Sequence, residues 1–335
     1  MSRTRARRRA LPAAVLTLPL LLTGVPTQPA HAFGTINGAG QHAEHERITR
    51  AALACAPGRA SDGRCFEPRS LDQLAGRTGT FGAVGAPDSD ENLTLAAHCD
   101  NADFLDAPGY ARTRAQASAQ LVACVQHLQR RFAEGIAAAP AVLTANGTGV
   151  RGAETDLSSD CTFVGGVAGR AKCNAVEGFG RALHGVQDFY AHSNWSDSPI
   201  AILPVGPRNP PGLRRTGASP LLALSTGVPP AASSVPRELS TGCFSLLWGC
   251  EGRIRHDDLN KDHGLIDPRT GEAGSPATPR GRVEGNFARA VQNAVADTRR
   301  QWNDFRNRLI ALHGAERGAR IACALTSDTP VQSCR

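Results

Sequence analysis

The chain has 335 residues and a formal net charge of +7, with 37 basic and 30 acidic side chains. Five of the arginines lie within the first nine residues and no acidic residue lies among the first 32, so residues 33–335 carry a formal charge of only +2. This near balance gives no support for a nucleic-acid partner. The chain also has few aromatic side chains on which bases stack, with 3 Trp and 2 Tyr.

Residues 1–32 have the pattern of a signal peptide. The arginine-rich start is followed by an apolar run over residues 11–25, which is too short and too often interrupted by proline for a membrane span. Ala30-His31-Ala32 fits the small-x-small pattern read by signal peptidase and predicts a mature chain that begins at Phe33. The arginine pair at positions 8 and 9 also permits export by the twin-arginine route. We therefore expect a secreted, extracellular protein.

Ten cysteines, an even number, all lie after residue 32, as expected for an exported chain in which disulfides persist. None has the CxxC spacing of a thiolate zinc site. Most fall in near pairs along the chain, although sequence alone does not fix their connectivity. The pairs that we predict are Cys55–Cys65, Cys161–Cys173, Cys243–Cys250 and Cys323–Cys334, which leaves Cys99–Cys124.

Helical periodicity, in which apolar residues recur at intervals of three and four, is clearest in four segments without proline. They are His42–Ala56, Ala115–Ala138, Ala175–Trp195 and Asn286–His313. Strand-like alternation is scarce, so residues 33–335 are predicted to form a single all-α domain. Two stretches rich in Pro and Gly, at about 196–236 and 267–282, predict loop excursions that are either lids over a site or insertions without a role in it.

The segment from Gly180 to Trp195 reads GRALHGVQDFYAHSNW. It spaces His184, Asp188 and His192 four residues apart, so on one helix they line a single stripe. Imidazole and carboxylate are ordinary zinc ligands, and a carboxylate can bridge two ions. The competing interpretation is a packed helix face, but burial of three ionisable side chains together without a cation costs much free energy. Gln187 is expected on a different face of the helix.

This segment resembles a helix of the heterokaryon-incompatibility C type proteins and, more distantly, the HxxxD helix of the zinc-dependent phospholipase C and P1 nuclease superfamily. The resemblance implies an all-α, single multi-helix domain of the phospholipase C/P1 nuclease type, with long irregular loops. It also implies two or three bound zinc ions.

The resemblance implies zinc ligands elsewhere in the chain. In the family, the amino group of an aromatic first residue and a helical histidine bind one zinc, which here implies Phe33 and His45, with His42 as the alternative histidine. An aspartate and a later histidine match Asp88 and His98. Three further carboxylates lie close enough in sequence to substitute: Asp90, Asp100 and Asp103.

A further zinc implies His192 together with a histidine that lies four residues before a glutamate. Glu284 matches the glutamate, at the start of a predicted helix, but Arg280 stands where the histidine is expected. Several candidate ligands precede this position: His256, Asp257, Asp258, Asp262 and His263. The run Asn260-Lys261-Asp262 resembles a short motif of the heterokaryon-incompatibility relatives.

A site of this kind suits phosphoester hydrolysis, and the resemblance implies that Asp88 orients or deprotonates the attacking water. The expected function is that of a secreted zinc-dependent phosphodiesterase, most readily a phospholipase C-like enzyme acting on phospholipid headgroups. The alternatives are a non-enzymatic, metal-stabilised interaction or toxicity protein and a single-strand nuclease. A phospholipid or membrane surface is the expected partner. The apolar segment Cys243–Cys250 is either a tip that touches it or a buried turn.

Overall fold

The computed structural model describes residues 33–38, 41–163, 169–245 and 249–334. The predicted signal peptide, and the centre of the apolar segment Cys243–Cys250, lie outside these residues. The described chain is mostly helical, and its strands form only two small two-stranded sheets, so the prediction of an all-α fold is confirmed at this level. None of the helices in the described ranges is both long and apolar enough to cross a membrane.

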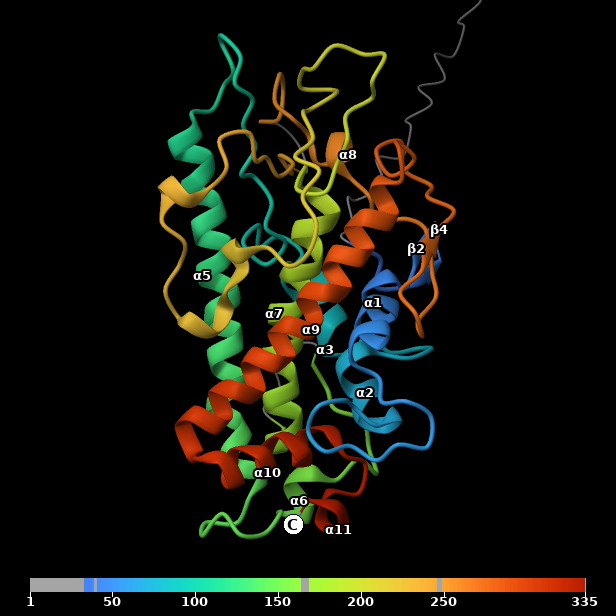
Figure 1. Ribbon diagram of the computed structural model, residues 1–335, viewed down its shortest axis with the longest axis vertical. Helices are drawn as coiled ribbons and strands as arrows, with labels where there is room; N and C mark the ends of the chain where they lie inside the picture. Colours follow the sequence, from blue (N-terminus) through green and yellow to red (C-terminus); the bar gives the residue numbers. More distant parts are fainter. Residues whose placement is uncertain (1–32, 39–40, 164–168, 246–248, 335) are drawn as a thin grey trace, which may run out of the picture.

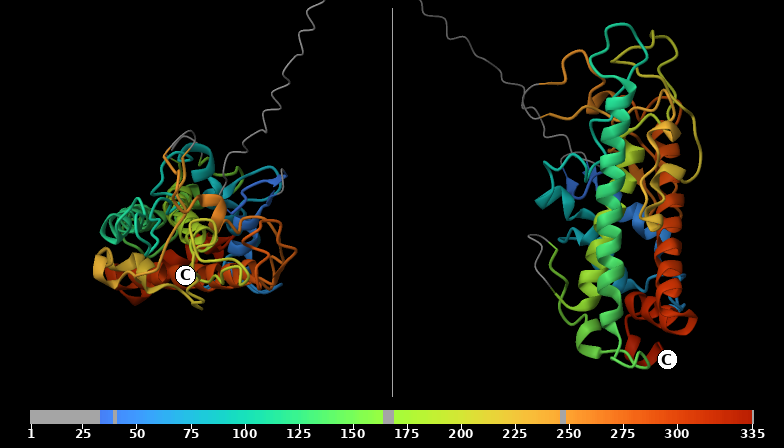
Figure 2. Two further views of the ribbon diagram at one scale, coloured as in Figure 1. Left: turned by 90° about the horizontal axis from the view of Figure 1, so that it is seen from above. Right: turned by 90° about the vertical axis from the view of Figure 1, so that its left-hand side faces the viewer.

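Three long helices run along the molecule: α5 (Arg114–Ala138), α7 (Ala171–His192) and α9 (Asn286–His313) (Figure 1; Figure 2, right). Each overlaps a segment of predicted helical periodicity, although α7 begins at Ala171 and ends at His192, where the prediction was Ala175–Trp195. Helix α7 is buried on nearly all sides, with only Asn174 and Glu177 less than fully buried. A helix enclosed in this way can present polar side chains to cavities inside the protein.

Small residues bring the neighbours of α7 close to it. A Cβ atom on Gly178 would collide with the backbone of Gly135 in α5, and one on Gly180 would collide with the backbone of α3 (Gly82–Gly85). Aromatic rings fill the lower half of the core, where Phe179 of α7 packs 5.3 Å from Trp302 and 5.0 Å from Phe305 of α9, centroid to centroid. These contacts fix the first half of α7 against α5, α3 and α9.

The N-terminal elements cover one side of α7. Helix α1 (Glu44–Leu53) packs on α9, and α2 (Pro68–Ala75) follows it (Figure 1). A tight pair, α3 and α4 (Pro87–Asp90), comes next; Arg181 of α7 fixes α4 through two hydrogen bonds of 2.8 and 2.7 Å to the carboxylate of Asp90. The short helices and strands elsewhere are β1 (Asn37–Gly38), β2 (Gln41–His42), η1 (Ala139–Val142), α6 (Gly152–Thr155), η2 (Pro220–Leu222), η3 (Leu224–Thr226), η4 (Ala232–Ser234), α8 (His256–Leu259), β3 (Leu265–Ile266), β4 (Ala273–Gly274), α10 (Ala315–Thr326) and α11 (Pro330–Ser333).

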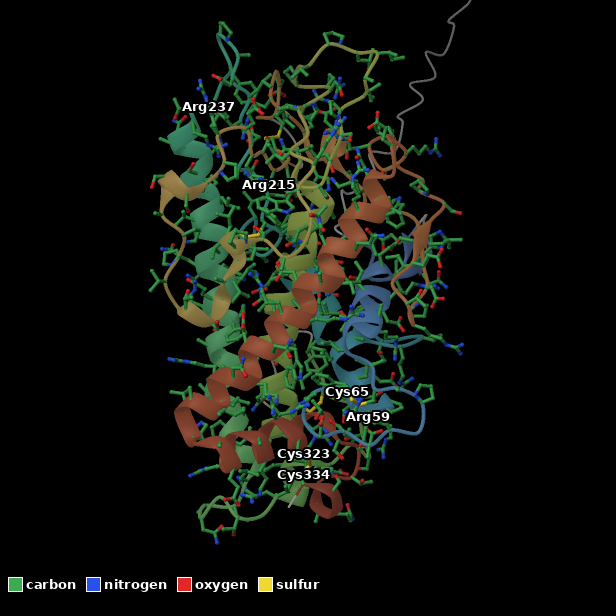
Figure 3. All side chains as sticks on the ribbon, in the orientation of Figure 1. Arg59, Cys65, Arg215, Arg237, Cys323 and Cys334 are labelled. Carbon is green, nitrogen blue, oxygen red and sulfur yellow. A yellow bond between two sulfur atoms is a disulfide. The ribbon has the colours of Figure 1, made fainter. Side chains whose placement is uncertain are left out.

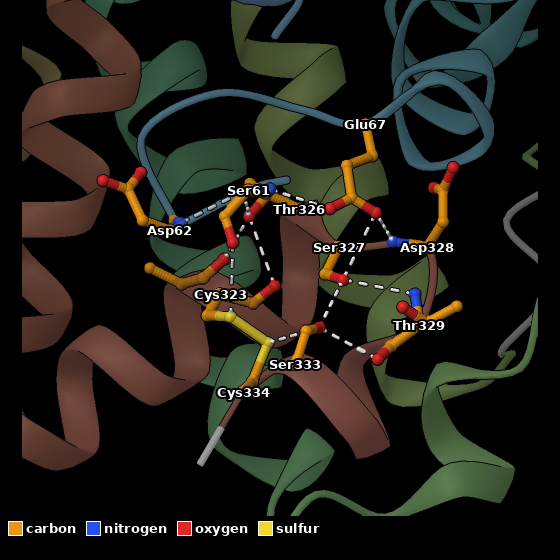
Figure 4. The surroundings of a disulfide bond; sticks show 12 residues. Ser61, Asp62, Glu67, Cys323, Thr326, Ser327, Asp328, Thr329, Ser333 and Cys334 are labelled. Atoms are coloured by element: carbon orange, nitrogen blue, oxygen red, sulfur yellow. Dashed lines mark hydrogen bonds between the residues drawn. A yellow bond between two sulfur atoms is a disulfide. The ribbon is translucent and has the colours of Figure 1, made fainter. Parts of the chain in front are cut away.

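All five predicted disulfides are present, and no cysteine is free. This usage is compatible with an exported chain. Cys323–Cys334 joins α10 to the residue that follows α11, at the lower end of the molecule (Figures 3 and 4). Beside it, Ser61 and Thr326 hydroxyls lie 2.6 Å apart, so the Cys55–Cys65 loop is tied to the same end.

The predicted excursion at 196–236 is irregular, with three short 3-10 turns, but it is only partly a surface feature. Its first residues, 196–198, are buried, and Leu221, Leu222 and Leu224 join the main core. The excursion is therefore fastened at its start and near its middle, while residues 201–205 are exposed.

Candidate metal centre

Five side chains from four elements meet beside the upper half of α7, and we call them the first cluster: His45, Asp88, His98, His184 and Asp188. Helix α7 supplies His184 and Asp188 one turn apart, and α1 supplies His45. Asp88 lies in α4 and His98 in the loop that follows it. The structure thus brings together five of the residues that the sequence analysis named as metal ligands.

Asp188 lies at the centre of the first cluster and is fully buried. Its Oδ1 is 3.2 Å from Nε2 of His45, and its Oδ2 is 3.1 Å from Nε2 of His184 and 3.0 Å from Nδ1 of His98. The two carboxylate oxygens therefore face different histidines. This is the geometry expected of a carboxylate shared between two cations.

Each histidine of the first cluster uses its outer nitrogen on an oxygen atom. Nδ1 of His184 lies 2.9 Å from the carbonyl oxygen of Val84, and Nδ1 of His45 lies 2.7 Å from the amide oxygen of Gln187. Nε2 of His98 lies 3.3 Å from the carbonyl oxygen of Glu91. Because these oxygens only accept, each outer nitrogen carries a proton. When a ring is neutral, its inner nitrogen then has a lone pair that points toward a carboxylate.

Lone pairs that face carboxylates repel each other unless a proton or a metal ion lies between them. Nε2 of His45 and Oδ1 of Asp188 are buried without a hydrogen-bond partner. Burial lowers the pKa of His98, but the hydrogen bond and charge of Asp188 outweigh it and raise that pKa to about 9. At His184, burial prevails and the pKa is lowered. At His45, burial also lowers the pKa, but Asp188 outweighs it and raises that pKa. Protons and a metal ion would therefore compete for the same inner nitrogens, and the donor set fits a metal ion.

Asp88 and His98 are the least enclosed members of the first cluster, with side chains 11% and 10% exposed. Oδ1 of Asp88 lies 3.6 Å from Nε2 of His184, and its Oδ2 accepts a hydrogen bond from Thr35. His184 and Asp188 are completely buried. A small molecule would therefore reach the cluster from the side of Asp88 and His98.

A second cluster lies one turn further along α7 and consists of Asp100, His192, His256 and Asp262. Nε2 of His192 is 2.8 Å from Oδ1 of Asp262, Nδ1 of His256 is 3.2 Å from Oδ1 of Asp100, and the two imidazole rings are 4.0 Å apart. All four side chains are at most 5% exposed. Three inward atoms lack a hydrogen-bond partner: His192 Nδ1, His256 Nε2 and Asp262 Oδ2.

The second cluster also has the electrostatics of a cation site. Burial opposes the charged form of His256, but Asp100 and Asp262 outweigh it and raise its pKa well above the ordinary value. Burial also opposes the charged form of Asp262. His192 and His256 outweigh this effect, so the pKa of Asp262 is lowered. The two clusters share two backbone segments, since α7 carries Asp188 and His192 while the loop after α4 carries His98 and Asp100.

Not all predicted ligands reach these clusters. Glu284 is 53% exposed and lies 3.6 Å from the guanidinium of Arg214, so the structure does not bring it to His192; Asp100, His256 and Asp262 stand there instead. Phe33 is fully buried with its ring 6.0 Å from that of His45, which is consistent with a place beside the first cluster. Cleavage before Phe33 involves residues outside the described chain.

Two of the aspartates considered as substitutes have other partners. Asp90 binds Arg181, and Asp103 binds Arg253 and the hydroxyl of Tyr110. Asp100 is the one that joins a cluster. In the sequence, the signal that marks Asp100 as a candidate ligand is its position two residues after His98.

Gln187 was expected on a different helix face, but it is completely buried and takes part in the site. Its Oε1 faces His45, while its Nε2 donates to Thr49 at 3.0 Å and to Thr298 at 3.2 Å. Those two donor contacts leave the amide oxygen turned toward the imidazole. Gln187 thus holds the ring of His45 in place.

No protein family model, curated protein or solved structure matches the chain. The likeness of Gly180–Trp195 to the heterokaryon-incompatibility and phospholipase C helices therefore stays a prediction. The functional assignment depends on the geometry of the two clusters.

Proposed function

We propose that the mature chain is a secreted zinc-dependent phosphodiesterase that cleaves phospholipid headgroups, with the first cluster as its catalytic centre. The observation that carries this proposal is the arrangement of three imidazole rings around Asp188. Each ring turns one nitrogen toward the cluster, while its outer nitrogen lies beside an oxygen that accepts a hydrogen bond. Neutral imidazole and carboxylate are the ligands that zinc prefers among side chains without sulfur.

His45, His98, His184 and Asp188 would hold the metal, with the mature amino group at Phe33 as a further donor beside His45. Bound zinc supplies an acidified water and a positive charge for the phosphate oxygens. Asp88 is suited to orient that water or accept its proton, since it borders the cluster, is partly exposed and is fixed by Thr35. His98 shares the open side and faces the incoming phosphoester.

The charge and aromatic content favour a phospholipid over a nucleic acid. Residues 33–335 have a formal charge of +2, and the few Trp and Tyr side chains give little stacking surface. Phosphodiester cleavage at a lipid headgroup needs neither a basic groove nor a stack of aromatic rings.

A second function is favoured by the burial of the second cluster. Its members are at most 5% exposed, so a metal there would stabilise the fold and would not meet substrate. If both clusters serve stability alone, the chain is a non-enzymatic metal-stabilised protein of the heterokaryon-incompatibility type.

Metal analysis and substrate assays together decide between these functions. Elemental analysis of the purified mature chain should find zinc, and a panel of phosphatidylcholine, a water-soluble phosphodiester and single-stranded DNA should show cleavage of the first two. Asp88→Asn should keep its zinc and lose most of the activity, whereas Asp106→Asn, at an exposed position, should change neither. A zinc-loaded chain that cleaves nothing in the panel would favour the metal-stabilised alternative.

A further inference from the structure

An exposed apolar tip projects from the start of the 196–236 excursion. Ile202 is 91% exposed, Val205 58% and Leu203 49%, and Ala201 and Pro204 are exposed beside them. Single exposed apolar residues are common, but adjacent ones on one narrow loop are not expected without a function. The loop extends from the upper end of the molecule, the end at which α7 finishes and α8 lies (Figure 1).

The backbone of the tip is already hydrogen-bonded within the tip. The buried side chain of Asn209 accepts from the N–H of Ile200 at 2.8 Å and donates to the carbonyls of Ile200, Leu203 and Pro204 at 3.0, 3.0 and 3.3 Å. Gly206 and Asn209 also exchange two backbone hydrogen bonds. Backbone groups that enter an apolar layer must be satisfied internally, so this loop meets that condition at these atoms.

The base of the tip is held by buried charges. Arg280 donates to Asp197 at 2.8 Å and to the carbonyl of Pro210 at 3.1 Å, and the Nζ of Lys261 lies 3.0 Å from Asp197. Lys261 directly precedes Asp262 of the second cluster. The tip is therefore fixed to the framework that surrounds the metal clusters.

The chain segment that contains the tip carries only basic charged side chains. Residues 198–236 contain three arginines and no acidic residue. Arg208 and Arg214 lie within 3.2 and 3.6 Å of Asp258 and Glu284, yet both remain largely exposed. Arg215, labelled in Figure 3, is exposed, and its guanidinium carbon lies 5.1 Å from the centroid of the Trp195 ring. Exposed arginines that follow an apolar tip in the chain are suited to the phosphates of lipid headgroups.

We propose that residues 200–205 enter the apolar layer of an anionic lipid surface while Arg208, Arg214 and Arg215 contact its headgroup phosphates. The exposed apolar side chains, the internally bonded backbone and the exposed arginines that follow in the chain are together suited to the apolar and headgroup layers of a lipid surface. That this contact delivers substrate to the first cluster rests on the proposed function. The contact itself can be measured without any hydrolysis.

Vesicle sedimentation of the purified mature chain tests the proposal. Vesicles of equal parts phosphatidylcholine and phosphatidylglycerol should bind the wild type, more weakly as salt increases. The affinity of the double variant Ile202→Ser/Leu203→Ser should be lower by about tenfold or more, because two aliphatic side chains are no longer transferred from water into the apolar layer of the lipid. Arg214→Gln/Arg215→Gln should also weaken binding. Val228→Ser, at a position 70% exposed and in the same excursion, should bind as the wild type does.

Melting temperatures should be the same for the wild type, the tip variant and the Val228 control, since all three positions face solvent. Failure of the wild type to bind vesicles, or an equal loss in Val228→Ser, would overturn the proposal, as would a tip variant that binds normally. Cleavage of a water-soluble phosphodiester should be unchanged in Ile202→Ser/Leu203→Ser. A chain that binds vesicles through the tip but cleaves nothing would refute the proposed function and leave the lipid contact standing.

Discussion

The Oε1 atom of Gln187 lies 2.7 Å from Nδ1 of His45, although the two residues are 142 positions apart in the chain. This contact joins α1 to α7 at the edge of the first cluster. It fixes the tautomer of His45, because the amide oxygen accepts a hydrogen bond from Nδ1–H and leaves Nε2 free to face Asp188. The arrangement of the site therefore depends on a residue that is not itself a ligand.

Gln187→Leu keeps the size of this side chain and removes the acceptor. Loss of an outer hydrogen bond of this kind typically lowers metal affinity by about 10- to 100-fold, so zinc should bind that much more weakly in competition with a chromogenic chelator. Gln301→Leu is the control, because Gln301 is also completely buried but binds Asp297 and the carbonyl of Leu222. Equal zinc affinity in the wild type and Gln187→Leu would show that His45 is not a ligand.

Asp188→Asn should remove metal from the first cluster while keeping its shape. The amide has no charge to offset a cation, so bound zinc should decrease and the melting temperature should fall with it. A chelator should lower the melting temperature of the wild type more than that of the variant, which keeps only the metal of the second cluster, and calorimetry would show this difference. An Asp188→Asn chain with full zinc content and the wild-type response to chelator would identify the stripe as a packed helix face.

Asp262→Asn should affect the second cluster alone. Asp262 contacts His192 and His256 and none of the first-cluster histidines. We expect the zinc content to fall by about one ion per chain, with lower stability, while the water-soluble phosphodiester is still cleaved. Elemental analysis and an activity assay on the same sample measure both effects. Loss of activity in proportion to the lost zinc would instead place the second cluster in the catalytic centre.

The long helices and the disulfides were predictable because both depend on short-range patterns. The core-facing residues of α7 and α9 repeat at helical spacing, and four of the five disulfides close loops with sequence separations of only 7 to 12. The stripe of His184, Asp188 and His192 also follows from helical geometry. Its division between two clusters does not, because that depends on which loops pack against each turn.

The composition of the second cluster could not be predicted from the sequence. Asp100 and Asp262 come from irregular segments and His256 from the four-residue helix α8, so none is marked by periodicity, and tertiary contacts such as the Lys261–Asp197 pair place them. The expected ligand Glu284 has a favourable position in the sequence but lies just before α9 with a positive φ of 42°, and its side chain faces Arg214. A residue spacing cannot reveal such a change of direction in the backbone.

The buried side chain of Lys172 leads to a prediction of how the free energy of unfolding depends on pH. It is completely buried in α7, and its Nζ donates to Ser70 Oγ at 2.8 Å and to the carbonyl of Ser327 at 2.7 Å. Burial lowers its pKa to about 7, although Asp328 and Glu67 oppose the shift. Between pH 7 and its ordinary pKa of 10.5, the unfolded chain binds more protons at this group than the folded chain. The free energy of unfolding should therefore rise with pH across this range.

Lys172→Met keeps an unbranched side chain of similar length and removes the titrating group. Urea unfolding of the metal-loaded chain between pH 7 and 10 should show a clear rise in stability for the wild type and a flatter profile for the variant, since a tenfold difference in proton affinity between the folded and unfolded chains corresponds to roughly 1.4 kcal/mol. Part of the rise should remain, because burial also lowers the pKa of Lys261, the other lysine of the chain, to about 8. Parallel profiles for the wild type and Lys172→Met would mean that Lys172 keeps its proton inside the folded protein, held by Asp328 and Glu67.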